Sequence, residues 1–218
     1  MKKTRDTMPA VDADLVWSAA CTAYRINGGY LKAPEVIGDQ VVRPTNRELV
    51  RRCLENLSLI TDVDREQAVA CRRQLASAVT LQALKTELGE WAKITARVCE
   101  LDTITSNYDL SIITAMPQSY AKTLKRESVD ARLARCDEAH VGQLKDKVEL
   151  VVEILRNNYS AKYNTWFVSG ITENNQAVFF AYREQLDSDQ TLKIRGTVKR
   201  LGDRTTQLNR VKIVGEPK

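Results

Sequence analysis

The chain has 218 residues, of which 43% are hydrophobic and 28% are charged, a balance typical of a globular protein that buries a core. Its apolar runs all fall short of the roughly 18 residues that a transmembrane helix needs. No hydrophobic segment of a secretory signal follows the basic amino end. We therefore expect a cytoplasmic protein that does not enter a membrane.

The first half of the chain predicts a helical domain at residues 11–127, behind a disordered tail at residues 1–10. Asp12 is a capping residue for a helix at about residues 13–24. Two apolar pairs at residues 36–37 and 41–42 flank Gly38-Asp39, a pattern that indicates a short hairpin.

Further helix starts follow the hairpin. Thr45 and Glu48 fit a capping box, in which each side chain bonds the backbone N–H of the other residue. Thr61 precedes a long stretch with apolar residues at helical spacing, which continues to Leu101. We expect Pro117 to break the last helix, because proline cannot donate the backbone hydrogen bond of a helix interior.

The last third of the chain predicts a small barrel at residues 143–216, joined to the helices by a polar linker at residues 128–142. Five apolar runs read as strands, at residues 148–155, 165–171, 177–182, 192–199 and 206–214. Residues 157–160 are expected to form the first turn. Five strands in about 70 residues favour an OB-like barrel over a sandwich, which needs roughly seven. The predicted fold class is therefore α+β, with a helical amino-terminal domain followed by a five-stranded OB-like β-barrel.

Positive charge concentrates in the predicted barrel. Residues 143–218 hold 13 basic and 9 acidic residues, whereas the preceding 142 residues hold 20 and 19. Seven cations form what we call the basic stripe: Lys193, Arg195, Lys199, Arg200, Arg204, Arg210 and Lys212. Such a stripe is typical of a protein that binds a polyanion. The alternative is a solvated face that maintains solubility.

Aromatic residues concentrate in the same region, since seven of the 13 lie after residue 142. Tyr159 and Tyr163 are expected to be exposed in the first turn. Alternation along the strands separates Trp166 from Phe167 and Phe179 from Phe180, but it leaves open which rings fill the barrel. Exposed rings could stack on bases. The candidate binding aromatics are Tyr159, Tyr163, Trp166 and Phe179.

Three segments of the barrel region carry a recognisable pattern, namely VFFA at 178–181, LKIRGTVK at 192–199 and TQLNRVK at 206–212. They resemble the carboxy-terminal part of phage-encoded replication and single-stranded-DNA-binding proteins, where a G-T-V-K strand leads through a polar loop to a Q-T-x-L-x-R-x-K strand. This chain differs in its short loop at 200–205 and in the reversed order of Thr206 and Gln207. The resemblance implies an OB-like barrel in a phage or prophage protein of DNA replication or recombination, acting in the host cytoplasm.

Catalytic motifs are not apparent. There is no glycine-rich phosphate loop, His–Glu metal pattern or Gly-x-Ser-x-Gly elbow, so we predict no enzyme activity, cofactor or metal. The five cysteines are odd in number and widely spaced, which argues against a zinc ribbon and a disulfide framework. The acid pairs Asp12/Asp14 and Asp62/Asp64 could hold magnesium in a nuclease, but capping explains acids at helix starts more simply.

These patterns together predict a protein that binds single-stranded nucleic acid, DNA in preference to RNA, through the basic stripe and neighbouring rings. A first alternative is that the helical domain docks a replication or anti-host-defence partner while the barrel is structural. A second alternative is a metal-dependent nuclease that uses the paired acids. The sequence leaves the oligomeric state open, a homo-oligomer included.

Overall fold

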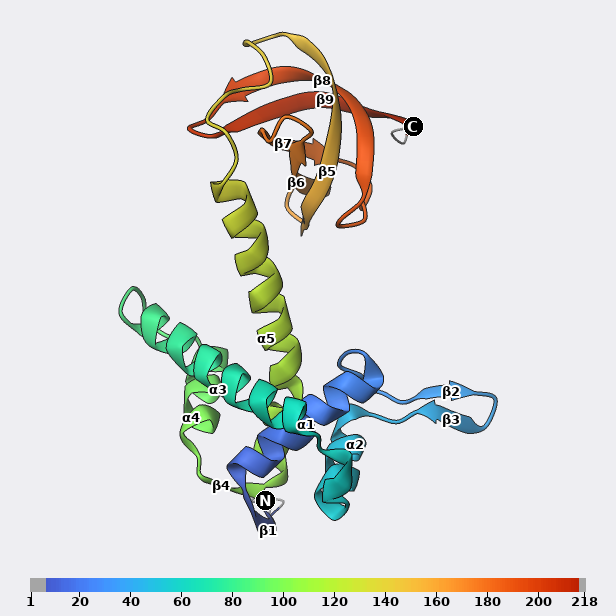
Figure 1. The fold of residues 1–218 in the computed structure, drawn as a ribbon, viewed down its shortest axis with the longest axis vertical. Helices are drawn as coiled ribbons and strands as arrows, with labels where there is room; N and C mark the ends of the chain where they lie inside the picture. The colour runs from blue at the N-terminus through green and yellow to red at the C-terminus, as the bar shows by residue number, and fades with distance from the viewer. Residues whose placement is uncertain (1–6, 216–218) are drawn as a thin grey trace. The chain divides into compact units, whose positions relative to one another are not determined.

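The structure is a computed structural model that describes residues 7–215. The chain divides into two compact units, residues 1–124 and 125–218. The described part contains five α-helices and a closed five-stranded barrel (Figure 1). The predicted α+β class, a helical amino-terminal part followed by a five-stranded barrel, is confirmed at this level. Within residues 7–215, no helix is both long and apolar enough to span a bilayer.

The first unit is built around one buried helix. Its elements are β1 (Thr7–Asp12), α1 (Ala13–Asn27), β2 (Glu35–Ile37), β3 (Gln40–Arg43), α2 (Asn46–Glu55), the short η1 (Leu57–Leu59), α3 (Asp62–Ala83), α4 (Glu90–Glu100), β4 (Thr103–Ser106) and the start of α5 (Asn107–Ala134). Helix α1 contacts both α2 and α3, and Ala19, Ala20 and Ala23 are fully buried. Such small side chains let neighbouring helices approach closely. The chain's five cysteines are buried free thiols.

The predicted caps at Asp12, Thr45 and Thr61 are confirmed, since their side chains accept from the backbone N–H groups of Leu15, Glu48 and Asp64. The box predicted at Thr45 is confirmed only in this half, because the Glu48 carboxylate bonds Arg52 at 2.7 Å. The reciprocal capping box is formed instead by Thr61 and Asp64. Asp64 is fully buried and also accepts two 2.8 Å hydrogen bonds from the Arg25 guanidinium. Burial opposes the charge of Asp64, but the hydrogen bonds from Arg25 and Thr61 outweigh it and hold the pKa of Asp64 well below its usual range.

Two parts of the helical prediction differ from the structure. Residues 7–10, assigned to a disordered tail, belong to β1, which pairs antiparallel with β4. The rest of that predicted tail, residues 1–6, lies outside the described residues. The predicted break at Pro117 is wrong, because α5 continues through it. Ile113 and Met116 are fully buried just before the proline, and their packing offsets the roughly 3 kcal/mol that an interior proline costs.

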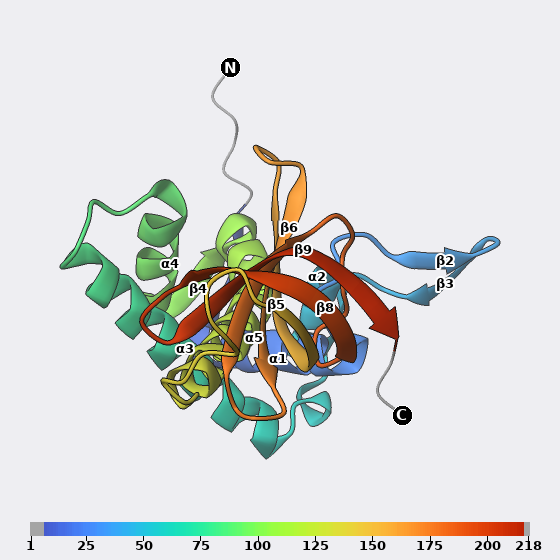
Figure 2. The ribbon, with the colours of Figure 1, turned by 90° about the horizontal axis from the view of Figure 1, so that it is seen from above.

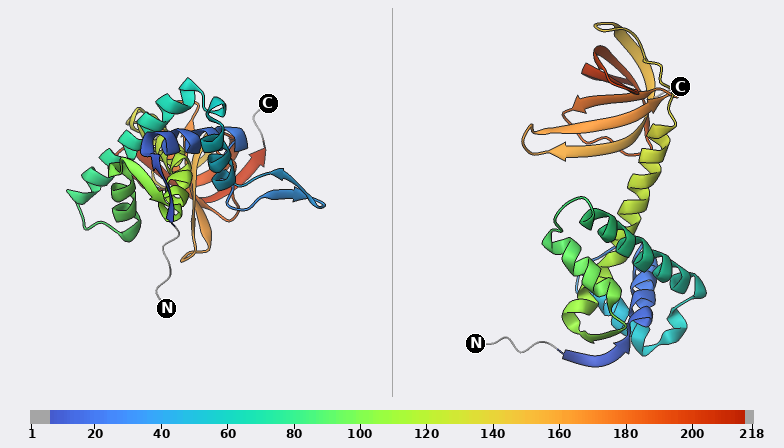
Figure 3. Two further views of the ribbon diagram at one scale, coloured as in Figure 1. Left: turned by 90° about the horizontal axis from the view of Figure 1, so that it is seen from below. Right: turned by 90° about the vertical axis from the view of Figure 1, so that its left-hand side faces the viewer.

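The predicted hairpin is confirmed as β2 and β3, which project from the helices of this unit (Figure 3). Its base is held by Arg43, which donates to both carboxylate oxygens of Glu35 at 2.9 Å and to the backbone oxygen of Asn27. Its apolar side chains are exposed, namely Val36, Ile37, Val41 and Val42. An isolated two-stranded hairpin is only marginally stable, so this anchoring at the base matters.

The second unit is the barrel together with the last residues of α5. Its strands are β5 (Lys147–Ser160), β6 (Thr165–Thr172), β7 (Ala177–Tyr182), β8 (Thr191–Leu201) and β9 (Thr205–Gly215). Around the barrel their order is β5-β6-β7-β9-β8, and β8 pairs with β5 to close it. Figure 2 shows the barrel strands β5, β6, β8 and β9 from above. Only the β7–β9 pair is parallel. The prediction of five strands forming a barrel is confirmed.

Two boundaries around the barrel differ from those predicted. The expected turn at residues 157–160 is wrong, because β5 continues to Ser160 and the turn lies at 161–164. The expected linker at residues 128–142 is structured. Its first residues complete α5, and the remainder bonds to the barrel, with Val141 donating to the Thr206 hydroxyl and Gln176 to the His140 carbonyl oxygen. These backbone groups have partners in the barrel, which explains why a polar segment is ordered.

Replacing Asp64 with Asn should lower the free energy of unfolding by about 2 kcal/mol at pH 7, since it weakens a cap and a charged hydrogen bond. Because the pKa of Asp64 is depressed in the folded state, its contribution is complete above the unfolded pKa of about 3.9 and is lost as pH falls through the folded pKa. The deficit of Asp64→Asn in urea unfolding should therefore shrink from pH 7 to pH 3. Asp62→Asn, on the same helical turn, is the control and should change little. An equal deficit at both pH values would contradict this account.

Candidate functional site

Alternation along β6 and β7 determines which rings reach the surface. Val168 and Phe180 are fully buried in the barrel, so Phe167 and Phe179 lie on the outer face of their strands, where both are half-buried. These two rings are stacked, with centroids 5.7 Å apart and an interplanar angle of 15°. Tyr163, 62% exposed in the turn between β5 and β6, meets Phe167 edge-on at 6.0 Å. We call Tyr163, Phe167 and Phe179 the aromatic ladder.

The other two predicted rings lie on the opposite face of the same hairpin. Tyr159 is in β5 rather than in a turn, directly opposite Trp166 of β6. Their ring centroids are 5.2 Å apart, and Trp166 packs against the barrel core. The structure therefore separates Tyr159 and Trp166 from Tyr163 and Phe179. The structure also places Phe167 with Tyr163 and Phe179. The sequence left open whether this ring fills the barrel, and its alternation with Trp166 was the only signal for its position.

The basic stripe divides into paired and unpaired cations. Lys193 and Arg195 both bond Glu149, each with a shortest distance of 2.7 Å. Arg204, in the turn between β8 and β9, donates to Glu138 at 2.6 Å and to the Ala134 carbonyl oxygen at 2.9 Å. The other four are exposed and make no ion pair within residues 7–215. We call Lys199, Arg200, Arg210 and Lys212 the unpaired cations.

Strand register brings one of these cations near the ladder. Phe179 pairs with Gln207 of β9, and Gln207 pairs with Arg200 of β8. Phe179 and Gln207 alternate with the buried Phe180 and Leu208, so their side chains lie on the outer face. A register shift between Val198 and Arg200 places Arg200 opposite Gln207 on that same face. Since neighbouring strands are about 4.8 Å apart, the Arg200 backbone lies roughly 10 Å from that of Phe179.

The ladder and the remaining cations extend in the same direction from this row. Phe167 lies opposite Ala181, so the ladder runs from Phe179 along the direction of β7. Strand β9 is parallel to β7 and continues past Gln207 to Arg210 and Lys212. The pairing of β7 with β9 ends at Phe180 and Leu208, so beyond this row the rings continue on β6 and the cations continue on β9. We call the line of cations from Arg200 to Lys212 the cation track.

A β-bulge places Arg210 on this track. Thr197 pairs with Asn209 and Arg195 with Lys212, so two residues of β9 lie opposite Gly196. Val211 packs against the core beside Gly196, where an added Cβ would lie 3.2 Å from the Val211 side chain. Arg210 is left exposed with φ at 52°, a left-handed conformation that is unfavourable for a residue with a Cβ.

The charges at the edge of this surface are fixed by hydrogen bonding. Glu149 receives hydrogen bonds from Lys193 and then Arg195, and these lower the pKa of its carboxyl group. Glu149 is therefore ionised at neutral pH and neutralises part of the basic stripe. The surface as a whole presents stackable rings, amides and uncompensated positive charge. This combination suits a polymer with planar bases and anionic phosphates.

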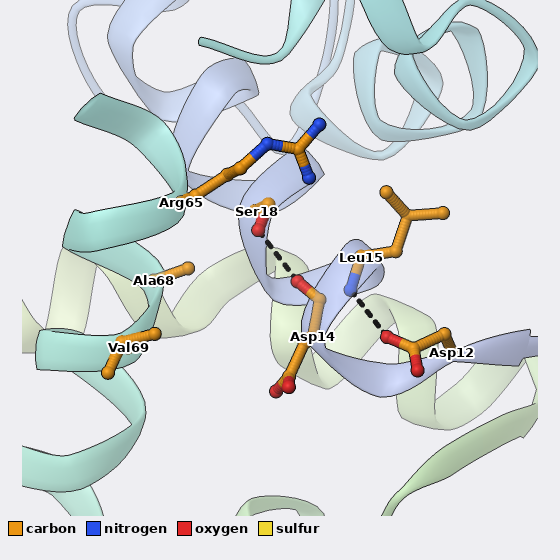
Figure 4. Close-up of a pocket in the computed structure, with 7 residues that line it drawn as sticks. All are labelled: Asp12, Asp14, Leu15, Ser18, Arg65, Ala68 and Val69. Carbon is orange, nitrogen blue, oxygen red and sulfur yellow. Dashed lines mark hydrogen bonds between the residues drawn. The ribbon is translucent and has the colours of Figure 1, made fainter. Parts of the chain in front are cut away.

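Three of the four acids considered for a nuclease, Asp12, Asp14 and Asp64, have structural partners. Asp12 caps α1 and lines a pocket of about 330 Å³ between α1 and α3 together with Asp14 (Figure 4). Asp14 bonds Arg72 at 2.6 Å, and Asp64 is held by Arg25. Within residues 7–215, no group of three or more His, Cys, Asp or Glu side chains could hold a metal ion. Capping, the simpler explanation at the sequence level, is confirmed for Asp12 and Asp64.

Replacing Arg210 with Gly should raise the free energy of unfolding by about 0.5–1 kcal/mol, because glycine adopts the left-handed conformation without strain. Thermal or urea unfolding measures this change. Arg200→Gly removes the same charge from an extended strand position and should destabilise instead. If Arg210→Gly is as destabilising as Arg200→Gly, the bulge is not strained.

No protein-family model, no curated protein and no solved structure matches this chain. The resemblance to phage replication proteins therefore stays a prediction, and the site rests on its geometry alone.

Proposed function

We propose that this protein binds single-stranded nucleic acid, DNA in preference to RNA, on the outer surface of β6, β7, β9 and β8. The observation that carries the proposal is the aromatic ladder, with Arg200 two strands away from Phe179 and further unpaired cations along β9. The closed five-stranded barrel fits an OB-like barrel, whose second and third strands and neighbouring loops bind oligonucleotides. In this chain those strands are β6 and β7, which hold Phe167 and Phe179.

Stacking favours a single strand over a duplex. A base that stacks on Phe179 or Phe167 must present a free face, which it does only outside the base-pair stack. Each such contact contributes about 1–3 kcal/mol. Phosphates would meet the unpaired cations of β8 and β9, which accounts for four exposed cations without acidic partners within residues 7–215, namely Lys199, Arg200, Arg210 and Lys212. The resemblance to phage proteins supports a role in DNA replication or recombination.

Fluorescence anisotropy with a labelled oligo-dT and a matched duplex tests this proposal. Four phosphate contacts predict that the logarithm of the binding constant falls with the logarithm of salt concentration at a slope of about −3. Phe167→Ala and Phe179→Ala should each weaken oligo-dT binding by about 1–3 kcal/mol, with an unchanged salt slope. Preference for the duplex, or binding that does not respond to salt, would refute the proposal.

Tyr159→Ala is the matched control for these variants. It removes an exposed ring from the same β5–β6 hairpin, but from the face opposite the aromatic ladder. Its oligo-dT affinity should equal that of the unmodified protein. If Tyr159→Ala costs more than Phe179→Ala, the nucleic acid lies on the other face of the hairpin.

A second candidate function is protein binding by the β2–β3 hairpin. Ile37 at its tip is 73% exposed, and Val36, Val41 and Val42 are each at least half exposed. Apolar side chains in such a row are typical of surfaces that contact another protein. If a second copy is the partner, light scattering should give the mass of an oligomer, and Ile37→Lys should reduce it to that of a monomer. A monomeric mass for the unmodified chain would contradict self-association.

A further inference from the structure

One carboxylate holds two cations of the basic stripe. Glu149 Oε1 accepts from Lys193 Nζ at 2.7 Å, and Glu149 Oε2 accepts from Arg195 Nη2 at 2.7 Å and from Arg195 Nε at 3.1 Å. Glu149 on β5 lies directly opposite Arg195 on β8 in the strand register. The three side chains are partly exposed, so the cluster is open to solvent and to another anion.

The cluster adjoins the proposed nucleic-acid surface. Arg195 pairs across the sheet with Lys212 of β9 on one side and with Glu149 of β5 on the other. Lys212 is an unpaired cation at the end of the track that begins at Arg200. Lys193 and Arg195 therefore continue the line of positive charge, and Glu149 is the first negative charge beyond it.

We infer that the Glu149 carboxylate binds Lys193 and Arg195 in the place of phosphate groups. It thereby blocks two phosphate-binding positions that these two cations would otherwise provide. A guanidinium binds carboxylates and phosphates through the same forked N–H groups, so the two anions compete for Arg195. This inference rests on the proposed function and deepens it. The phosphate-binding path ends at Lys212 in the unmodified protein, and Glu149 limits the affinity of the site.

The competition does not depend on pH near neutrality. The hydrogen bonds from Lys193 and Arg195 keep the Glu149 carboxyl ionised, because they lower its pKa. Glu149 is therefore displaced only by another anion that binds the same cations. Partly exposed ion pairs contribute little to stability, so neutralising Glu149 should leave the barrel folded.

The test is Glu149→Gln, measured by anisotropy with oligo-dT over a series of salt concentrations. Two added phosphate contacts should steepen the salt slope from about −3 to about −4 and raise affinity at low salt by about tenfold. Glu173→Gln, in the turn between β6 and β7, makes the same change in net charge at a residue without an ion pair in the described chain, and its slope should equal that of the unmodified protein. Glu149→Thr, a strand-forming replacement, serves as a second neutral variant.

A triple variant shows whether the gain comes from the released cations. Adding Lys193→Gln and Arg195→Gln to Glu149→Gln should return the slope to about −3, because the extra phosphate contacts are lost. If the unmodified protein binds but Glu149→Gln has the slope of Glu173→Gln, the inference is overturned and the proposed function stands. If neither protein binds oligo-dT at any salt concentration, the proposed function itself fails.

Discussion

The barrel core fixes the direction of every side chain on its outer surface, because successive strand residues point to opposite faces. Burial of Val168 in β6 and Phe180 in β7 forces Phe167 and Phe179 outward, where their rings stack on each other. The insertion of β9 between β7 and β8 then sets the neighbours of these rings. A core formed from apolar side chains thus determines the placement of outward-facing rings, amides and cations that never enter it.

Local sequence patterns predicted where the strands lie better than they predicted how the strands pair. The strand expected at residues 177–182 occupies those residues in the structure, because its apolar run and flanking turn residues are local signals. Nothing local specifies the register of β6 against β7, in which Trp166 pairs with Tyr182 and Phe179 with Ser169, so the sequence grouped Trp166 with Phe179 although they lie on opposite faces. Residues 157–160 carry turn-forming asparagines, yet pairing with β6 keeps them extended.

Charge counts in the sequence also overstate the free charge of the site. The basic stripe has seven cations, but Glu149 lies 46 residues before Arg195 and Glu138 lies 66 residues before Arg204. Ion pairs between residues so far apart follow from tertiary pairing, which no short window reveals. The helical unit shows the same contrast between local and long-range contacts. The cap at Thr61 was predictable from nearby residues, whereas the hydrogen bond from Arg25 to Asp64 was not.

The position of β9 has a consequence for synthesis of the chain on the ribosome. Strand β9 is the last of the five in sequence but lies between two earlier strands, so β7 and β8 each keep an unpaired edge until residues 205–215 have emerged. Open edges of this kind can pair with other chains. The interval between synthesis of β8 and of β9 is therefore the period in which a nascent barrel is most exposed to aggregation.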